Sequence, residues 1–307
     1  MSDIVISEFM DPAAIDRHFA GRSVLYDPKL VDQPERLLAA VAECRALIVR
    51  NRTQVRGALL DAATRLKVVG RLGVGLDNID VEACAARAIA VRPATGANDL
   101  AVAEYVVTAA LLLLRRAWFA SDRVIAGEWP RMASIGREGA GKRLGLVGYG
   151  AIARLTAGKA SALGFQVGAY DPYLPADHAA WRDAERLTLE ALLASSDVVS
   201  LHTPLTPTTR RLIDAAALSR MKRDAILINA ARGGIVDEAA LIDALRGGRL
   251  GGAALDVFDT EPVDANAGGA FHGIANLILT PHIAGVTDES NVRVSDVTAR
   301  AVSEALT

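Results

Sequence analysis

The stretch LGLVGYGAIA at residues 144–153 passes from an apolar run into a glycine-rich turn and then into a helical sequence. It has the pattern GxGxxA in the order strand, turn, helix. The first glycine, Gly148, permits a tight turn, and the second, Gly150, lets the backbone approach a pyrophosphate at the helix N-terminus. The small Ala153 allows the helix to lie close to the strand. The stretch therefore predicts a dinucleotide-binding unit, with a helix that ends at Gly164.

An acidic residue follows this loop at the distance that ribose recognition requires. Asp171 lies 21 residues after Gly150, at the end of the next apolar run, where its carboxylate can accept hydrogen bonds from ribose hydroxyls. The same charge repels a 2′-phosphate, and the residues up to Pro175 include no arginine to bind one. NAD is therefore the expected cofactor rather than NADP. The alternative is that Asp171 only begins a turn with Pro172.

Short apolar runs rich in β-branched residues alternate with helical stretches along the whole chain. Such alternation predicts parallel sheets covered by helices on both faces. The expected strands are 4–6, 46–49, 67–69, 89–91, 144–147, 167–170, 198–201, 226–228, 253–255 and 277–279. We therefore expect an α/β fold of two doubly wound, Rossmann-like parallel-sheet domains with a cleft between them.

Two turn-rich stretches divide the chain. The first, PATGAND at 93–99, precedes an apolar helix expected over about 100–116. The second, EPVDANAGG at 261–269, precedes one more strand and a terminal helix with Val294 and Val297 on its apolar face. This last segment is too short to be a domain, so we expect it to return to the first domain, with no regulatory domain after it. The expected domains are 1–95 together with 283–307, and 96–282.

Composition excludes several classes of protein. The 307 residues are 51% hydrophobic and 23% charged, as expected for a globular chain of about two domains. The net charge of −2 gives no general attraction to nucleic acid or to an anionic membrane. The most apolar run, at 106–114, is far shorter than the ~20 residues that cross a bilayer. The N-terminus does not resemble a secretory signal, and Cys44 and Cys84 suit a reducing compartment, so we expect a cytoplasmic protein without a metal site.

Six motifs occur in the order in which one family carries them. They are GRLGVGLDNID (70–80), LGLVGYGAIA (144–153), HTPLTPTT (202–209), INAARGGIVDE (228–238), AALDVFDTEP (253–262) and PHIAG (281–285). On these residues the chain resembles the D-isomer-specific 2-hydroxyacid dehydrogenases, and especially their D-3-phosphoglycerate dehydrogenase-like branch. The resemblance implies hydride transfer between NAD and a small 2-hydroxy or 2-keto acid. It also implies a substrate-binding first domain, an NAD-binding second domain and a homodimer formed through an arm near Trp118 to Trp129.

The resemblance assigns the chemistry to three residues. Arg232 is expected to bind the substrate carboxylate and carbonyl, His282 to give and take the proton, and Glu261 to pair with His282. Reduction of a 2-keto acid adds a hydride to carbon and a proton to oxygen, so the site needs a cation and an acid that works near neutral pH. A guanidinium holds a carboxylate with two hydrogen bonds, and a carboxylate partner favours the protonated form of an imidazole. Each residue alone is compatible with a structural role, but together they predict an active site at the carboxyl ends of strands.

The other binding residues follow from the same resemblance. Those expected to hold NAD are Gly148, Gly150, Ala151, Ile152 and Asp171, with Thr203 and Pro204 beside the adenosine half and Ala230 and Asp256 near the nicotinamide amide. Those expected to contact the substrate are Arg50, Asn51, Arg71, Val74, Gly75, Arg232 and His282. His202 is expected to be structural or to lie beside the cofactor, and not to act as an acid.

The choice of substrate depends on two arginines. Arg50 and Arg71 match family arginines that hold a distal anion, which is useful for a phosphate or sulfonate at carbon 3. The alternative is that both are surface residues. Asn51 stands where related sequences have serine, which leaves the exact substrate open. We expect a 3-phosphoglycerate-like or sulfolactate-like substrate; the alternatives are a glyoxylate or hydroxypyruvate reductase and a non-catalytic NAD-sensing scaffold.

Overall fold

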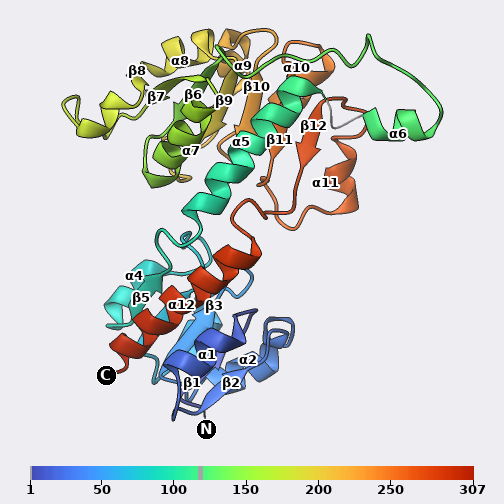
Figure 1. Ribbon diagram of the computed structural model, residues 1–307. Helices are drawn as coiled ribbons and strands as arrows, with labels where there is room; N and C mark the ends of the chain where they lie inside the picture. Colours follow the sequence, from blue (N-terminus) through green and yellow to red (C-terminus); the bar gives the residue numbers. More distant parts are fainter. Residues whose placement is uncertain (1, 117–119) are drawn as a thin grey trace. The chain divides into compact units, whose positions relative to one another are not determined.

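The computed structural model describes residues 2–116 and 120–307, which form two compact units, each with its own sheet (Figure 1). Unit 1 consists of Met1–Asn98 and Val286–Thr307, and unit 2 of Asp99–Gly285. The terminal helix therefore belongs to the first unit. The junctions expected at 95/96 and 282/283 lie three residues before the ones in the structure.

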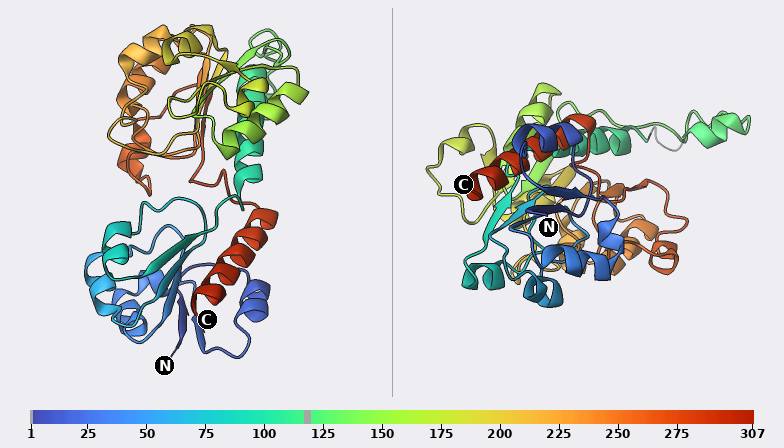
Figure 2. Two further views of the ribbon diagram at one scale, coloured as in Figure 1. Left: turned by 90° about the vertical axis from the view of Figure 1, so that its left-hand side faces the viewer. Right: turned by 90° about the horizontal axis from the view of Figure 1, so that it is seen from below.

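Unit 1 contains a five-stranded parallel sheet in the order β2-β1-β3-β4-β5. Its strands are β1 (Ile4–Ile6), β2 (Val24–Tyr26), β3 (Ala46–Val49), β4 (Val68–Arg71) and β5 (Ala90–Pro93). One face packs on α1 (Pro12–His18) and α12 (Asp288–Ala305), which lie together beside the sheet in the left view of Figure 2. The other face packs on α2 (Pro34–Val41), α3 (Gly57–Ala62) and α4 (Val81–Ala86), with the short helix η1 (Leu30–Asp32) before α2.

Unit 2 contains a seven-stranded parallel sheet in the order β12-β11-β10-β9-β6-β7-β8. Its strands are β6 (Arg143–Val147), β7 (Gln166–Tyr170), β8 (Glu185–Arg186), β9 (Val198–Leu201), β10 (Ile226–Asn229), β11 (Gly252–Leu255) and β12 (Leu277–Leu279). The four residues of β9, of β10 and of β11 are all buried, because helices cover both faces of these strands.

The helices of unit 2 divide between the two faces of its sheet. One face packs on α5 (Asp99–Arg115) and α7 (Ala151–Ala162), and the other on α8 (Leu189–Ser195), α9 (Ala215–Arg220) and α10 (Glu238–Arg246). The remaining helices are α6 (Ala120–Ile125), η2 (Ala179–Arg182) and α11 (Ala265–Gly269). None of the helices that the structure describes is long and apolar enough to cross a membrane.

The predicted class of two parallel-sheet α/β domains is confirmed, since both sheets are parallel and carry helices on both faces. The cleft expected between the domains stays a prediction. Every run predicted as a strand overlaps an observed strand, and the helix expected over about 100–116 is α5. The sequence did not predict β2 and β8. The three residues of β2 are only half-buried and β8 has two exposed residues, so neither has the continuous apolar pattern of the central strands.

Candidate active site

The point where the strand order of unit 2 reverses lies between β6 and β9. From β6 the chain continues to β7 on one side, and it later returns to the other side of β6 as β9. Loops that leave such a switch point diverge, and they form the place where open α/β sheets bind ligands. Gly148 follows β6 directly, and His202 and Thr203 follow β9.

The two glycines of the loop after β6 are required for different reasons. Gly148 has a φ of +89°, and a Cβ added to it would lie 2.6 Å from the carbonyl oxygen of His202, so the protein itself requires glycine there. Gly150 has a φ of −77°, and apart from its two chain neighbours no described residue has an atom within 4 Å of an added Cβ. The fold itself therefore does not require a glycine at position 150. The open space beside it suits a ligand that approaches the backbone closely.

The N-cap residue of α7 is Gly150, which has no side chain to cap the helix. By contrast, the N-cap residues of α9 and α10 are Asp214 and Asp237, whose carboxylates accept hydrogen bonds from the first turn. The first N–H groups of α7 are thus available to an anion, and the helix dipole favours a phosphate there. Ala151 and Ile152 lie in this first turn, so the loop fits the pyrophosphate of NAD.

Gly150→Ala is expected to weaken NADH binding about tenfold or more and to leave the melting temperature unchanged, because the added methyl group occupies ligand space only. Gly148→Ala is the matched comparison, and it is expected to lower the melting temperature by several degrees, because it meets the His202 carbonyl. Fluorescence titration with NADH and thermal unfolding measure the two effects. Unchanged NADH affinity in Gly150→Ala would exclude this loop as the pyrophosphate site.

Asp171 accepts backbone hydrogen bonds from two different segments. Its Oδ2 accepts the Tyr149 N–H at 2.9 Å and so holds the glycine loop, and its Oδ1 accepts the N–H groups of Tyr173 and Leu174 at 2.9 and 3.2 Å. The turn considered as the alternative is therefore present. A carboxylate has about four acceptor positions, so among the described residues one position on Oδ2 stays available for a ribose hydroxyl.

The residues after β9 lie beside the glycine loop. The Thr203 hydroxyl is buried and has no hydrogen-bond partner among the described residues, which suits a contact with a bound cofactor. His202 is within 3.0 Å of the Ser200 hydroxyl, and burial lowers the pKa of its imidazole to about 4. A histidine that is neutral at physiological pH does not serve as the acid, which agrees with the expected structural role. Pro204 follows Thr203 in the same loop.

The loop after β10 positions Arg232. The buried Asn229 donates from its amide to the Arg232 carbonyl at 2.8 Å and accepts the Ala231 N–H at 3.1 Å, which shapes the turn that also includes Ala230. The next residue, Gly233, lies so close to the Phe258 carbonyl that a side chain would collide with it. The Arg232 guanidinium donates to the Ala231 carbonyl at 2.6 Å.

Glu261 and His282 form the predicted pair. The distance between His282 Nδ1 and Glu261 Oε2 is 2.7 Å, and Glu261 Oε1 accepts the Phe258 N–H at 2.9 Å. Burial opposes ionisation of Glu261, but the hydrogen bonds from His282 and Phe258 and the charges of His282 and Arg232 lower the pKa of this carboxyl group overall. Because Nδ1 is engaged, Nε2 is the ring nitrogen that can exchange a proton with a substrate.

Asp256 holds the loop that carries His282. Its Oδ1 accepts the Thr280 hydroxyl at 2.6 Å and the Ile283 N–H at 2.8 Å, and its Oδ2 accepts the Ala284 N–H at 2.8 Å. Burial raises the pKa of Asp256 in spite of these hydrogen bonds. His282 has a φ of +57°, which is uncommon for a residue with a side chain, and these contacts hold it in that conformation. A role of Asp256 beside the nicotinamide stays a prediction.

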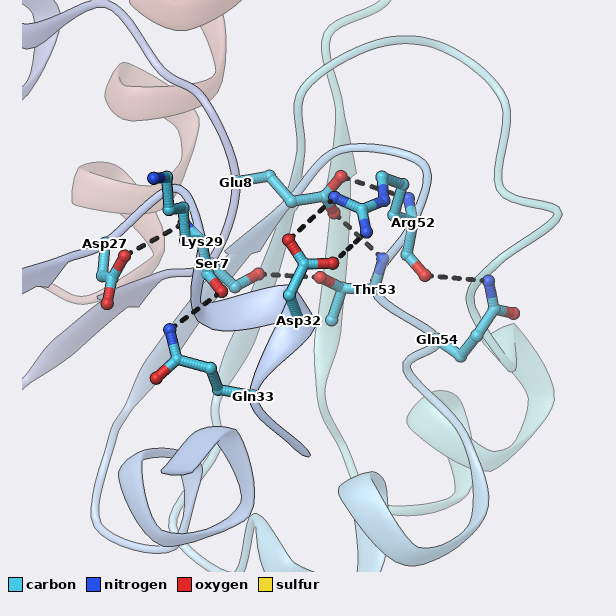
Figure 3. A network of polar contacts seen from close by, with 9 residues as sticks. All are labelled: Ser7, Glu8, Asp27, Lys29, Asp32, Gln33, Arg52, Thr53 and Gln54. Atoms are coloured by element: carbon cyan, nitrogen blue, oxygen red, sulfur yellow. Dashed lines mark hydrogen bonds and ion pairs between the residues drawn. The ribbon is translucent and has the colours of Figure 1, made fainter. Parts of the chain in front are cut away.

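A buried carboxylate holds the loop after β3 in unit 1. Glu8, which follows β1, accepts the N–H of Thr53 on Oε1 at 3.0 Å and that of Arg52 on Oε2 at 3.1 Å (Figure 3). Its Oε1 also accepts the N–H of Arg50 at 2.9 Å. The amide of Asn78 donates to the carbonyl oxygens of Thr53 and Arg50 at 2.7 and 3.2 Å. Five hydrogen bonds therefore fix the backbone of residues 50–53, which we call the RNRT loop.

The cations expected to bind substrate have different surroundings. Arg50 lies over the Phe9 ring, donates to Asn291 Oδ1 at 2.8 Å, and has a buried Nε without a partner among the described residues. Burial lowers the pKa of its guanidinium. Arg71 folds back toward Gly73 and donates to the Leu72 carbonyl at 2.7 Å. Neither is an exposed surface arginine.

The other expected substrate residues of unit 1 are accessible. Asn51 is exposed in the RNRT loop, and Val74 is exposed and Gly75 half-buried after β4. Sequence reasoning missed Glu8, Asn78 and Asn229 as supports of the site. Their position in the sequence could have indicated two of them. Glu8 follows a buried strand and Asn229 ends one, and parallel strands bind ligands at their carboxyl ends.

Comparisons with known proteins identify the family of this chain. A family model described as D-isomer specific 2-hydroxyacid dehydrogenase, NAD binding domain, matches residues 107–284. The (S)-sulfolactate dehydrogenase of Chromohalobacter salexigens is 55% identical over 307 residues, which cover 100% of this chain and 99% of that protein. The D-3-phosphoglycerate dehydrogenase of Mycobacterium tuberculosis is 43% identical over 305 residues, which are 99% of this chain but 56% of that protein. This chain thus spans about half the length of the mycobacterial relative.

A solved structure shows the same fold with cofactor bound. The D-lactate dehydrogenase from Aquifex aeolicus, crystallised with NAD and lactic acid, has a TM-score of 0.84 and 28% identity, covering 97% of this chain and 93% of that one. The chain belongs to the D-isomer specific 2-hydroxyacid dehydrogenase family. It is an NAD-dependent 2-hydroxyacid dehydrogenase, which confirms the predicted family, activity and cofactor. The alternative of a non-catalytic scaffold is therefore not retained.

Proposed function

We propose that this enzyme interconverts a three-carbon 2-keto acid that has a sulfonate at carbon 3 with the corresponding 2-hydroxy acid, as in sulfolactate. The observation that carries the proposal is the 55% identity, over the full chain, to an (S)-sulfolactate dehydrogenase. The half-buried Arg50 supports it, because a guanidinium suits a distal anion. Arg52 is paired with Asp32, so in this region the guanidinium groups considered for the distal anion are those of Arg50 and of Arg71, which uses Nη1 to donate to the Leu72 carbonyl. This limited supply of cations suits a sulfonate, which has one negative charge, better than a phosphate, which approaches two.

In the proposed reaction Arg232, His282 and Glu261 each have a separate role. NADH, when bound, supplies a hydride to carbon 2 of the keto acid. Arg232 holds the substrate carboxylate and so orients the carbonyl group. His282 gives the proton on Nε2 to the carbonyl oxygen as the C=O electron pair moves onto that oxygen, which yields the hydroxyl group. Glu261 keeps the ring oriented through Nδ1 and stabilises its protonated form, and in the oxidative direction His282 takes the hydroxyl proton back.

A panel of keto acids tests the substrate, with NADH oxidation as the readout. Sulfopyruvate is expected to have the highest kcat/KM, ahead of phosphohydroxypyruvate, hydroxypyruvate and glyoxylate. Arg50→Ala and Arg71→Ala are each expected to reduce kcat/KM for sulfopyruvate about tenfold or more, because a charged hydrogen-bond partner is lost, and to change kcat/KM for glyoxylate little.

The matched control is Arg52→Ala in the same loop. Its side chain is exposed and paired with Asp32, and its backbone N–H, which Glu8 holds, is unchanged by the substitution. Arg52→Ala is therefore expected to behave like the unmodified enzyme. Equal losses for sulfopyruvate and glyoxylate in Arg50→Ala would show that Arg50 supports the loop and not the substrate. A preference for glyoxylate or phosphohydroxypyruvate in the unmodified enzyme would overturn the sulfonate assignment.

The proposed enzyme is a cytoplasmic homodimer. The segment after α5 exposes large apolar side chains, with Ile125 84%, Trp129 81% and Met132 79% accessible, as expected of a surface that a second copy covers. Trp118, where the expected arm begins, lies outside the described residues. Cys44 and Cys84 are buried free thiols, which suits a reducing compartment.

A further inference from the structure

A second carboxylate, that of Glu238, contacts the same turn as Glu261 of the Glu261–His282 pair. Glu238, the first residue of α10, is half-buried, and its Oε1 accepts the Asp259 N–H at 2.6 Å. Glu261 Oε1 accepts the N–H of the preceding residue, Phe258, at 2.9 Å. Two consecutive N–H groups of one turn are thus each held by a carboxylate, and one of these carboxylates also holds the His282 ring.

A role in helix stability alone does not explain this arrangement. Acidic residues in the first turn of a helix interact favourably with its dipole while exposed, as Glu190 does in α8. Glu238 instead is held partly out of water and close to other negative charges. Burial, and then the charges of Asp259 and Glu261, raise its pKa, although the Asp259 N–H opposes them. Placing like charges together in a half-buried position costs free energy and is typical of functional sites.

We propose that Glu238 is a positioning residue of the dehydrogenase reaction: it holds the turn at residues 258–261 so that Glu261 meets His282, and its charge favours the proton-carrying state of that pair. The inference rests on the proposed role of Glu261 and His282 as the acid. Within the described residues, Arg232 and His282 are the cations whose charges act on Glu261. The charges of Glu238 and Glu261 act on each other, so Glu238 offsets part of the charge of Arg232.

The direction of the effect on pH dependence follows from the charge. Reduction requires a proton on the Glu261–His282 pair, and a nearby negative charge makes loss of that proton harder. The same charge makes protonation of Glu261 easier at low pH. Removal of the charge of Glu238 therefore moves both the basic and the acidic limb of the pH profile to lower pH, as expected for two coupled groups.

The test compares Glu238→Gln with Glu238→Ala in the full-length enzyme, using kcat/KM for keto-acid reduction from pH 5 to pH 10. Glu238→Gln keeps an oxygen for the Asp259 N–H and removes the charge, so the basic limb, which lies within this range, is expected to move to lower pH by about half a unit. Glu238→Ala also releases the turn. Its kcat is expected to be about tenfold lower than that of Glu238→Gln, with the KM for NADH unchanged. Glu190→Gln removes an exposed first-turn carboxylate from α8 and is expected to leave the profile in place.

Two results would overturn the proposal. An unshifted profile in Glu238→Gln would show that the charge does not act on the pair. Lowered thermal stability in both variants, with kcat and the profile intact, would show that Glu238 only stabilises α10. A failure of the proposed acid is distinguishable, because it appears as retained turnover in His282→Ala, whichever way the Glu238 variants behave.

Discussion

His282→Ala is expected to lower kcat for keto-acid reduction by about 10²-fold or more, with NADH affinity retained. The reason is geometric, because Glu261 engages Nδ1 at 2.7 Å and leaves Nε2 to give the proton. Without the imidazole, the proton must come from a water molecule that the protein does not hold in place. Stopped-flow or steady-state NADH oxidation measures kcat, and fluorescence titration measures NADH binding.

His272→Ala is the control for this prediction, since His272 is an exposed histidine of the same unit that belongs to none of the motifs. It is expected to keep full activity. Turnover of His282→Ala near that of the unmodified enzyme would exclude His282 as the acid. A parallel loss of NADH affinity would indicate that the loop held by Asp256 had changed shape rather than lost an acid.

The second large effect is expected for Arg232. Arg232→Ala is expected to reduce kcat/KM for every 2-keto acid by about 10²- to 10³-fold, because removal of one partner of a close charge pair costs ~2–5 kcal/mol. Arg232→Lys keeps the charge but loses the planar fork, so an intermediate loss is expected. The carboxylate is common to all substrates in the panel, so the loss is expected to be the same for sulfopyruvate and glyoxylate.

That uniformity separates Arg232 from Arg50, whose removal is expected to affect only acids with a distal anion. Arg223→Ala, at an exposed position in the same unit, serves as the control for loss of a positive charge. A loss confined to sulfopyruvate in Arg232→Ala would mean that Arg232 binds the distal anion and not the carboxylate. Steady-state kinetics with both acids decides between these roles.

Most of the fold was predictable because its signals are local. The buried central strands are continuous apolar runs, and the turn with Gly148 and Gly150 has a strict order of strand, turn and helix. The edge strand β2 was not predictable in this way, because it is held by pairing with β1 and not by burial on both faces. Its existence depends on a neighbour in space.

The buried face of the terminal helix, α12, was also only partly predictable from local sequence. The sequence predicts that this segment returns to the first domain, because it is too short to be a domain, and places Val294 and Val297 on its apolar face. In the structure the buried face of α12 also includes Ser290, Ser295 and Thr298. The hydroxyl of Ser295 accepts the Asp11 N–H at 3.0 Å, and that of Thr298 donates to the Arg71 carbonyl at 3.3 Å. Polar residues become core residues where a partner happens to lie opposite them, which no helical periodicity reveals.

The sequence by itself determined the α/β class and the family, because short motifs with fixed spacing carry this information. Through the same motifs it predicted the glycine loop as the NAD site and Arg232, Glu261 and His282 as the reacting residues. Only the tertiary structure decided what holds them in place. Glu8 meets the RNRT loop across more than 40 residues of chain, and Asp256 meets the loop of His282 from a neighbouring strand. Such hydrogen bonds form between loops that leave adjacent strands of a sheet, and strand adjacency follows from the topology of the whole domain rather than from nearby sequence.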